Sequence, residues 1–584
     1  MRFAPQARRP LLSTTALFTG ALAGTAVYAQ LADPPRAGFA SATLRYSTTV
    51  GGDDGVGRSF VIDADGNMII AGHVEYPYDL AIVTAVDDDP GSQGAEGFIV
   101  KINAAGDDVV FSTYFGGEGE DRITGVEVDA DGNIYVVGFT EAADFPTTEG
   151  SLQPLIGHAP PAFGSIFDGF AAKFDPLGEL VWSTYLGGGE NDEAYGLRVG
   201  TDGSVYVVGT STSFGFPTTD GSYQPDCNEQ FDLCSDAFVI RIAPNGGSLV
   251  FGSFIGGDSF AEAACSVDVD EEGAIFVAGQ YFNAGFPYVD AFQDFHDAGA
   301  DWWVTKFTPD GSSLEWSSGL GGNGTESVCN TFQIGAALAL DANGDVFVGG
   351  LTSSTNLTAS GTYQPNFGGV TDGYLAKITS SGSFVWGTYF GGEGIEAILD
   401  VAVMADGSPV IVGTSGSLSF PATPDALDES DCPSQTVFCA PDAFVAVLSS
   451  DGTALQFSTQ LGGSDTDEAT GVAVGADGTL YVGGTTDTEL WPLVDPLPDP
   501  LRGLAGPFIA QIGDDAAPIP GDVNGDGNVT ASDALAGLSA ALVATQCLLC
   551  VCDLNGDGAI TATDALLILN LAVGVTPPID PPAC

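Results

Sequence analysis

Residues Phe111 to Thr148 read FSTYFGGEGEDRITGVEVDADGNIYVVGFTEAADFPTT. The stretch contains a strand-like run ending in Gly-Gly, an acidic loop, two further strand-like runs joined by Asp-Ala-Asp-Gly, and a Phe-Pro-Thr-Thr turn. Variants of it recur along most of the chain, and an internal repeat of this length decides the fold before any local pattern does. The first glycine of the pair recurs at Gly51, Gly116, Gly187, Gly256, Gly321, Gly391 and Gly462. A second glycine lies near the end of the last strand-like run of this stretch in each copy, at Gly72, Gly138, Gly209, Gly279, Gly350, Gly413 and Gly484.

Each copy contains four short runs that are typical of β-strands. In the second copy they are Ile123–Asp129, Ile134–Thr140, Gly169–Phe174 and Leu180–Leu186. The runs are rich in β-branched and aromatic residues, and the turns between them are rich in glycine and aspartate. Four antiparallel strands repeated radially form a β-propeller, which hides most strand edges between blades. Seven copies therefore predict an all-β, seven-bladed propeller of four-stranded antiparallel blades.

The two ends of the repeat region predict how the ring closes. Ala42–Thr48 matches the fourth run of a copy, and Pro507–Ile512 matches the third run without a successor. We expect these two segments to pair, so that one blade is built from both ends of the region. The same strand order places the Phe-Pro-Thr-Thr loops and the acidic Gly-Gly loops on one face, here called the long-loop face. The short Asp-x-x-Gly turns fall on the other, and any glycan or protein ligand is expected on the long-loop face.

The repeat resembles the SBBP family of seven-bladed propeller repeats. The motifs that carry the resemblance are best seen in one copy: Trp182–Gly188, Phe216–Thr219, Tyr223-Gln224-Pro225 and Asp236–Ile242. The resemblance covers about residues 42 to 512 and implies a fold, not an activity. Two copies depart from the Phe-Pro pattern, with Leu357-Thr358 in the fifth and Trp491-Pro492 in the last.

The charge of the chain disfavours one class of partner. There are 14 lysine and arginine residues against 77 aspartate and glutamate residues, a formal net charge of −63. Such a surface repels phosphate backbones, so no nucleic acid partner is expected. Calcium binding or simple solubility fits this charge.

Residues 1–29 are interpreted as a signal peptide. Arg2, Arg8 and Arg9 form a basic region, an apolar stretch follows, and Val27-Tyr28-Ala29 is a small-x-small cleavage site. We expect cleavage before Gln30, with a Sec-type route favoured over a twin-arginine route. The protein is expected to be secreted and extracellular, with the cell surface or periplasm as alternatives. No run of about 18 apolar residues follows later in the sequence, so no transmembrane segment is expected.

Ten cysteines in an exported chain should mostly form disulfides. Cys227 with Cys234, and Cys432 with Cys439, stand seven apart at matching places of two loops, and each pair is predicted to staple its loop. Cys265 and Cys329 are predicted to bridge neighbouring copies. Four cysteines remain for the C-terminal region, where disulfides of any of three connectivities are favoured over a zinc site: Cys547, Cys550, Cys552 and Cys584.

Several residues of the propeller are candidates for a functional site. The acidic loops Glu118–Asp121, Glu190–Glu193 and Asp465–Glu468 could hold a cation or a catalytic carboxylate pair, but they recur with the repeat, which favours turn capping. The Asp63–Asn67 and Asp129–Asn133 turns lack the further ligands of a calcium loop. Tryptophans at one repeat position are predicted to pack between blades, whereas Trp302 and Trp303 are less regular; that position holds Trp182, Trp316 and Trp386, and elsewhere Phe111, Phe251 and Phe457. His73, His158 and His296 match no triad or metal cluster, so no catalytic residue is assigned.

The C-terminal region contains the most specific chemical motif of the chain. Two twelve-residue segments, DVNGDGNVTASD from Asp522 and DLNGDGAITATD from Asp553, have oxygen ligands at positions 1, 3, 5 and 12 and glycine at position 6. This is the pattern of an EF-hand calcium loop, in which position 7 contributes its backbone carbonyl. Two calcium ions are predicted, with these ligands: Asp522, Asn524, Asp526, Asn528, Asp533, Asp553, Asn555, Asp557, Ala559 and Asp564.

The region from Gly521 to about Val575 resembles the type I dockerin family. Aspartate replaces glutamate at position 12, and a predicted helix follows each loop without one before it, at Ala534–Val543 and Ala565–Val573. The resemblance implies a small helical domain that folds on calcium and a near-symmetric surface that binds a cohesin module. The family's recognition positions fall on Ala531, Ser532, Ala562 and Thr563, and alanine at the first of each pair departs from the commoner residue.

The predicted domains are a signal peptide (1–29), the propeller (38–513), a linker (514–520), the dockerin-like domain (521–575) and a tail (576–584). The leading hypothesis is a secreted, non-catalytic, calcium-binding protein whose propeller displays a surface and whose C-terminal module docks to a cohesin-like partner. One alternative is a carbohydrate-active hydrolase or lyase with its site on the long-loop face. Another is a purely structural surface protein, and the C-terminal domain could also serve stability or secretion alone.

Overall fold

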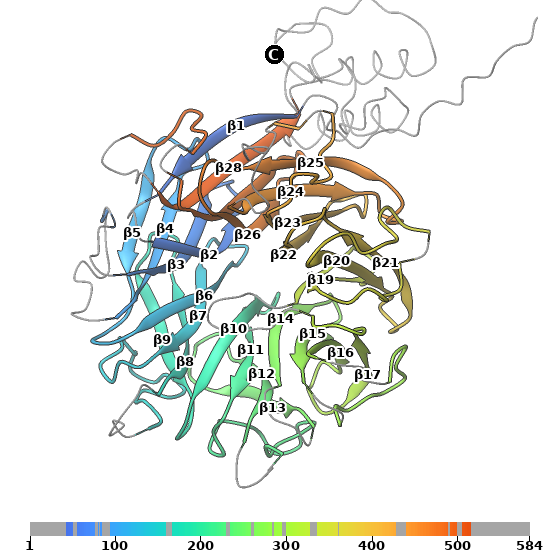
Figure 1. Cartoon of the computed structure of the whole chain (residues 1–584). Coiled ribbons are helices and arrows are strands. Elements are labelled where there is room, and N and C mark those ends of the chain that lie inside the picture. Colours follow the sequence, from blue (N-terminus) through green and yellow to red (C-terminus); the bar gives the residue numbers. More distant parts are fainter. Residues whose placement is uncertain are drawn as a thin grey trace, which may run out of the picture. The chain divides into compact units, whose positions relative to one another are not determined.

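The computed structural model describes residues 42–514 except 51–54, 76–79, 81, 84–93, 159–165, 229–233, 258–261, 283–284, 295–298, 327–335, 360, 425, 428–439, 489–490 and 499–504. Within this part of the chain every regular element is a β-strand. The strands form seven separate sheets of four, and every neighbouring pair is antiparallel. The predicted seven-bladed propeller is therefore confirmed (Figure 1).

Each blade has an innermost, a second, a third and an outermost strand. The innermost strands are β2 (Gly55–Ile62), β6 (Asp121–Val128), β10 (Asp192–Val199), β14 (Ala263–Val269), β18 (Ala337–Leu340), β22 (Glu396–Val403) and β26 (Asp467–Val474). The second strands are β3 (Met68–Val74), β7 (Ile134–Thr140), β11 (Val205–Ser211), β15 (Ile275–Tyr281), β19 (Val346–Thr352), β23 (Pro409–Ser415) and β27 (Leu480–Thr486). The third are β4 (Glu96–Ile102), β8 (Asp168–Phe174), β12 (Asp236–Ile242), β16 (Asp301–Phe307), β20 (Asp372–Ile378), β24 (Asp442–Leu448) and β28 (Gly506–Asp514). The outermost are β1 (Ala42–Thr49), β5 (Val109–Tyr114), β9 (Leu180–Leu186), β13 (Leu249–Ile255), β17 (Leu314–Leu320), β21 (Phe384–Phe390) and β25 (Leu455–Leu461).

The first and last strands close the ring together. β1 pairs with β28 from Ala42 opposite Asp514 to Thr49 opposite Phe508, and Figure 1 shows blue β1 beside orange β28. The loop between β27 and β28 adds a side-chain bond, because the Trp491 indole donates to the Ser47 hydroxyl at 2.6 Å. The predicted blade made from both ends of the repeat region is confirmed.

A β-bulge explains the glycine that recurs near the end of the second strand in six of the seven blades. In the second blade the register shifts between Ile123 and Gly125 of β6. The shift directs the Arg122 carbonyl oxygen at β7, where a Cβ added to Gly138 would lie 1.9 Å from it. Only glycine fits this approach, so the recurring glycine records a bulge in the neighbouring strand.

Aromatic side chains of the outermost strands lock each blade to the next. Trp182 is 4% exposed and lies against Gly246, whose φ is 68° and whose added Cβ would be 2.4 Å from the indole. The indole N–H donates to the Pro244 carbonyl at 3.1 Å. The same contact recurs in other blades, and the predicted packing role of these residues is confirmed: Tyr46 on Gly106, Phe111 on Gly178, Phe251 on Gly311, Trp316 on Gly382 and Trp386 on Gly452.

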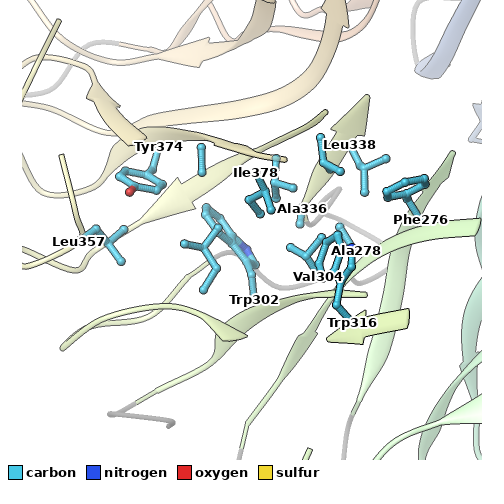
Figure 2. Packing of buried hydrophobic residues seen from close by; sticks show 14 of the residues in the cluster. Phe276, Ala278, Trp302, Val304, Trp316, Ala336, Leu338, Leu357, Tyr374 and Ile378 are labelled. Atoms are coloured by element: carbon cyan, nitrogen blue, oxygen red, sulfur yellow. The ribbon is translucent and has the colours of Figure 1, made fainter. Parts of the chain in front are cut away.

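The two less regular tryptophans are core residues. Trp302 and Trp303 are both fully buried in β16. Figure 2 shows Trp302 directed toward Tyr374 of the following blade, and their ring centroids are 6.5 Å apart. Leu357, which replaces the usual phenylalanine, is buried in the same cluster. Neither tryptophan is available to stack on a ligand.

Candidate functional site on the long-loop face

The predicted grouping of loops on one face is confirmed by contacts between them. In the second blade the Glu118 backbone N–H donates to Asp144 at 3.0 Å, and the Glu120 N–H donates to Glu141 at 3.2 Å. The acceptors belong to the segment that leads into Phe-Pro-Thr-Thr, whereas the donors belong to the acidic loop. The acidic loop and the Phe-Pro-Thr-Thr loop of one blade therefore lie side by side.

The acidic loops are capped by the aspartate at the start of the next inner strand. Asp121 accepts from the Gly117 N–H at 2.9 Å, Asp192 from the Gly188 N–H at 2.6 Å, and Asp467 from the Gly463 N–H at 2.9 Å. Capping was the role that their repetition favoured, and these bonds support it. The remaining acids at the loop tips are exposed: Glu118, Glu190 and Asp465.

The Asp-x-x-Gly turns on the opposite face are turn chemistry, as predicted. Asp63 accepts from the backbone N–H groups of Asp65 and Asn67 at 3.0 and 2.9 Å. Its other oxygen forms a buried ion pair of 2.9 Å with Lys101. The carboxylate is thus engaged by backbone and lysine, which accounts for the recurring aspartate without a metal ion.

A cluster of polar side chains on the inner strands and at the end of the neighbouring second strand β3 was missed by the sequence analysis. Arg122 of β6 is at its centre: its guanidinium contacts His73 Nε2 at 2.9 Å and donates to Glu120 at 2.6 Å and Glu75 at 3.2 Å. In the next blade the Tyr195 hydroxyl donates to Glu193 at 2.7 Å. These residues, with Arg58 and Glu468 of adjoining inner strands, are called the inner-strand cluster.

The inner-strand cluster lies where the repeat is broken. Arg122 is the second residue of its strand, and the equivalent residues are Val56, Glu193, Ala263, Ala397 and Glu468. The residue paired with this position also varies, and it is histidine only at His73. In the sequence, the signal is a position that varies among the copies of an otherwise regular repeat. Contacts between neighbouring blades then bring the variable residues together.

Burial controls the ionisation of the cluster. Burial lowers the pKa of His73 well below its usual value, and the charges of Arg122 and Arg58 lower it further, so the imidazole is neutral at pH 7. Burial raises the pKa of Glu193, with the Tyr195 hydrogen bond opposing and the Glu120 charge adding to the shift. Burial also raises the pKa of Glu468, against the charge of Arg58. A neutral imidazole beside guanidinium and carboxyl groups has the components of general acid–base chemistry.

The cysteines and histidines are only partly described. Cys227 and Cys234 form the predicted disulfide, with Cα atoms 5.8 Å apart. Cys265 is disulfide-bonded, but its predicted partner Cys329 lies outside the described residues. Burial raises the pKa of Asp168 to about 6, and the hydrogen bond from the Gly157 N–H and the charge of His158 oppose the shift. His296, Cys432 and Cys439 lie outside the described residues.

The predicted calcium loops, the recognition residues Ala531, Ser532, Ala562 and Thr563, and the four C-terminal cysteines also lie outside the described residues. In the described part of the chain, no three histidine, cysteine or carboxylate side chains converge as a metal site. None of the described elements is a helix with the length and hydropathy that a membrane span requires.

Two family models match separate parts of the chain. Residues 110–146 match the beta-propeller repeat family SBBP, and residues 520–571 match the dockerin type I domain. The regulatory protein FlaEY of Caulobacter vibrioides is 24% identical over 396 residues, which are 64% of this chain and 38% of that protein. The chain thus matches well under two thirds of the length of this relative.

Solved structures with a similar chain path include three of low identity. A protein of unknown function from Dyadobacter fermentans has a TM-score of 0.35 at 10% identity, covering 81% of this chain and 100% of that chain. A streptogramin B lyase has a TM-score of 0.38 at 8% identity, covering 81% and 98%. An ulvan lyase of family PL25, bound to a saccharide, has a TM-score of 0.38 at 11% identity, covering 76% and 93%.

The fold and the family matches together identify the two parts of the chain. The described strands form seven antiparallel four-stranded blades, and a repeat within them matches a propeller repeat family. The second match begins after the last strand of the propeller. The described part of the chain is therefore a seven-bladed β-propeller in which one repeat matches the SBBP family, and a segment that matches the dockerin type I family follows it.

Proposed function

We propose that this protein is an exported docking protein, in which the dockerin-like module binds a cohesin-like partner in the presence of calcium and the propeller presents the long-loop face to the surroundings. The observation that carries the proposal is the dockerin type I match at residues 520–571, which coincides with the duplicated calcium loops. Calcium loops of this composition fold their own domain when the ion binds, so docking would require calcium.

The arrangement of the propeller supports a display role. Its blades are joined by buried aromatic contacts and its ring is closed by strand pairing, so the long-loop face is held on a rigid frame. The acidic tips at Glu118, Glu190 and Asp465 give this face a negative charge. A basic or neutral ligand fits such a surface better than an acidic polymer does. The predicted signal peptide at residues 1–29 would place the protein outside the cytoplasm.

Binding of the full mature chain to a panel of purified type I cohesin modules tests this proposal. We expect binding in calcium buffer and its loss in chelator. Asp522→Ala combined with Asp553→Ala removes the first ligand of both loops and should reduce affinity at least 100-fold. Asp580→Ala in the C-terminal tail is the matched control and should bind like the parent.

A second pair of variants separates recognition from calcium binding. Ser532→Arg alone should leave binding nearly intact, because the dockerin surface is duplicated, whereas Ser532→Arg with Thr563→Arg should abolish it and leave calcium uptake unchanged. Cohesin binding that persists in chelator would refute the proposal. Calcium uptake without binding to any cohesin would instead favour a domain that serves stability or secretion.

The inner-strand cluster favours a second candidate function, catalysis on a glycan. Neutral His73 is held by Arg122, and the Glu193–Tyr195 pair lies on the next inner strand. Acid–base groups of this kind suit the cleavage of a glycosidic bond by hydrolysis or elimination. The cluster is the described site that departs most from the repeat, as an active site should.

A screen on polysaccharides, read by reducing ends and by unsaturated products, tests this candidate. Activity that falls at least 100-fold in His73→Ala and Arg122→Ala, with unchanged melting temperature, would support catalysis. Lys306→Ala on the turn face is a control and should retain activity. Absence of turnover on all substrates, or turnover unaffected by both cluster variants, would contradict it.

A further inference from the structure

An exposed phenylalanine lies on the long-loop face of the third blade. Phe214 follows β11 in the loop that leads to Phe-Pro-Thr-Thr, and its side chain is 53% exposed. Every other aromatic side chain of the described residues is buried or partly buried. The equivalent residues of other blades include Ala143, Thr355 and Leu418, so the repeat does not require an aromatic ring at this position. A ligand that covers the ring would gain free energy from its burial.

In other blades a polar side chain joins the two loops beside this position. The Glu118 N–H of the Gly-Gly loop donates to Asp144 at 3.0 Å, and the Asn323 N–H donates to Asn356 at 2.8 Å. In both blades the donor is the third residue of the Gly-Gly loop, and the acceptor directly precedes the first residue of the Phe-Pro position. Side chains therefore fill the space between the loops in these blades.

The third blade has glycine at both positions of this bridge. Gly189 stands at the donor position and Gly215 at the acceptor position, and neither has a left-handed φ that would require glycine. A Cβ added to either would meet no atom of the described residues within 4 Å, its chain neighbours aside. The two loops still lie together, since a Cβ added to Gly188 would be 3.1 Å from the carbonyl carbon of Gly215. The missing side chains leave open space beside Phe214, and this space is called the glycine notch.

The glycine notch lies within reach of the inner-strand cluster. Thr210 of β11 pairs with Glu193 of β10, and Phe214 follows Thr210 by four residues, which span at most about 14 Å. The loop continues alongside the start of the inner strand, because the Thr212 N–H donates to the Asn191 carbonyl at 2.8 Å. A ligand made of several linked units can therefore contact Phe214 and the cluster together.

The chemistry around the notch fits a sugar. The face of an aromatic ring is negative, so it attracts the C–H groups on one face of a pyranose. Glu190 and Asn191 are exposed beside the notch and can accept or donate hydrogen bonds to hydroxyl groups. The negative charge of the loops disfavours a sugar that carries a carboxylate or sulfate.

We propose that Phe214 and the glycine notch form a binding subsite for a neutral sugar ring of a polysaccharide. Phe214 supplies the stacking surface, and the two glycines provide the room that side chains occupy in other blades. The subsite rests on the proposed role of the long-loop face as the surface that meets a ligand. It does not require that the inner-strand cluster be catalytic.

Affinity electrophoresis of the full mature chain tests the subsite. The gels contain galactomannan or xyloglucan as neutral polysaccharides, or polygalacturonate as an acidic one. We expect retardation in at least one neutral gel and none in polygalacturonate. Phe214→Ala should lower the association constant at least 10-fold, whereas Phe214→Tyr should retain it. Leu418→Ala, at the equivalent exposed position of the sixth blade, is the matched control and should bind like the parent.

A second variant fills the notch without removing the aromatic ring. Gly215→Asp introduces the residue of the second blade, where this side chain accepts a hydrogen bond from the Gly-Gly loop. The variant should therefore melt no lower than the parent and yet bind at least 10-fold more weakly. Binding by Gly215→Asp equal to that of the parent would show that the notch does not hold the ligand.

The outcomes separate this subsite from the proposed functions. Absence of retardation in every neutral gel, retardation unchanged by Phe214→Ala, or stronger retardation in polygalacturonate would overturn the subsite. Binding of peptides that depends on Phe214, without binding of polysaccharide, would also overturn it. Phe214-dependent binding without turnover would support the subsite and contradict only the catalytic candidate. Cohesin binding by the C-terminal module should be the same in all these variants, so failure of docking is read independently.

Discussion

Six blade junctions of this propeller and the seventh solve the same packing problem in different ways. The six are spanned by a continuous chain and have a buried carboxylate on each side, such as Asp168 at the start of β8 and Asp192 at the start of β10. The seventh joins the closing blade to the first and has glycine, Gly506 and Gly55, at the equivalent positions.

The closing blade itself is completed by β1–β28 pairing and by the bond from Trp491 to Ser47. Across the seventh junction β2 contacts β26 and β27, where the Thr470 hydroxyl donates to the Gly57 carbonyl at 2.8 Å and the Gly57 N–H donates to Thr485 at 2.9 Å. The difference shows that blade packing alone does not require the acids, which at the inner strands accept bonds from the N–H groups of the Gly-Gly loops.

The largest effect should come from opening the closing blade. Deletion of residues 42–49 removes β1, exposes the edge of β28 and uncovers buried side chains of the core. We expect a loss of more than about 5 kcal/mol, which is comparable to the whole stability of many domains. Denaturant unfolding and size-exclusion chromatography would measure it.

A chain that starts at residue 38 is the control for this deletion, because it retains β1. Unfolding as cooperative as that of the parent after removal of β1 would show that strand pairing does not close the ring.

Breaking one ordinary junction at its aromatic contact should have the next largest effect. Trp182→Ala removes a buried indole that packs on Gly246, and it should cost about 3–5 kcal/mol by the usual range for such truncations. Trp182→Phe retains most of the packing and loses the bond to the Pro244 carbonyl, so about 1 kcal/mol is expected. Chemical denaturation measures the free energy of unfolding of both variants. Equal losses in the two variants would show that packing is not the main contribution of Trp182.

The buried carboxylates of these six junctions should make stability depend on pH. Burial raises the pKa of Asp121 and Asp192 to about 7, above the unfolded value of 3.8. The folded state therefore binds protons more tightly, so this contribution is full below pH 3.8 and is lost as pH rises toward 7. We expect a loss of about 1–3 kcal/mol per pair over that range in chelator.

Melting temperatures between pH 4 and pH 8, with and without Asp192→Asn, would measure this loss. The variant should reduce the pH dependence of the melting temperature by the contribution of one carboxylate pair. A profile that rises toward pH 7 in chelator, for parent and variant alike, would contradict the assignment.

The turn face should show the opposite pH dependence and the smallest effect. Burial raises the pKa of Asp129, but the hydrogen bonds from Asn133 and Tyr135 and the charge of Lys173 outweigh it, so the pKa is lowered. Its contribution is present above pH 3.8 and is lost as pH falls through the folded pKa. Asp129→Asn should cost about 1 kcal/mol at pH 7 and nothing at pH 2. Equal destabilisation at both pH values, by denaturant unfolding, would show that the charge is irrelevant there.

Much of the fold could be predicted because each blade repeats the same local pattern. The Gly-Gly pairs, the turn aspartates and the alternating apolar runs recur about every 70 residues, so one copy explains the others. The closing strands were predictable for the same reason, since Ala42–Thr48 is a fourth strand without its blade. The tryptophan at position 182 was predicted to pack because phenylalanine fills the same position elsewhere.

The inner-strand cluster and the carboxylate pairs were not predictable in this way. His73 and Arg122 are 49 residues apart and meet only because the second strand of one blade, β3, contacts the inner strand of the next, β6. Asp168 and Asp192 were visible as two separate motifs, the start of an apolar run and the end of an acidic loop. Their pairing depends on the contact between β8 of one blade and β10 of the next.

The sequence by itself determined the number of blades, the strand order, the face of each loop and the duplicated C-terminal motif, because each follows from patterns within a few dozen residues. Only the tertiary structure decided which polar groups share a buried space. The hydrogen-bond donors and cationic groups near a buried acid depend on distances between blades, and a linear sequence pattern does not contain those distances. The Gly-Gly pair illustrates both: its spacing counts the blades, and the room above its first glycine is seen only when two blades meet.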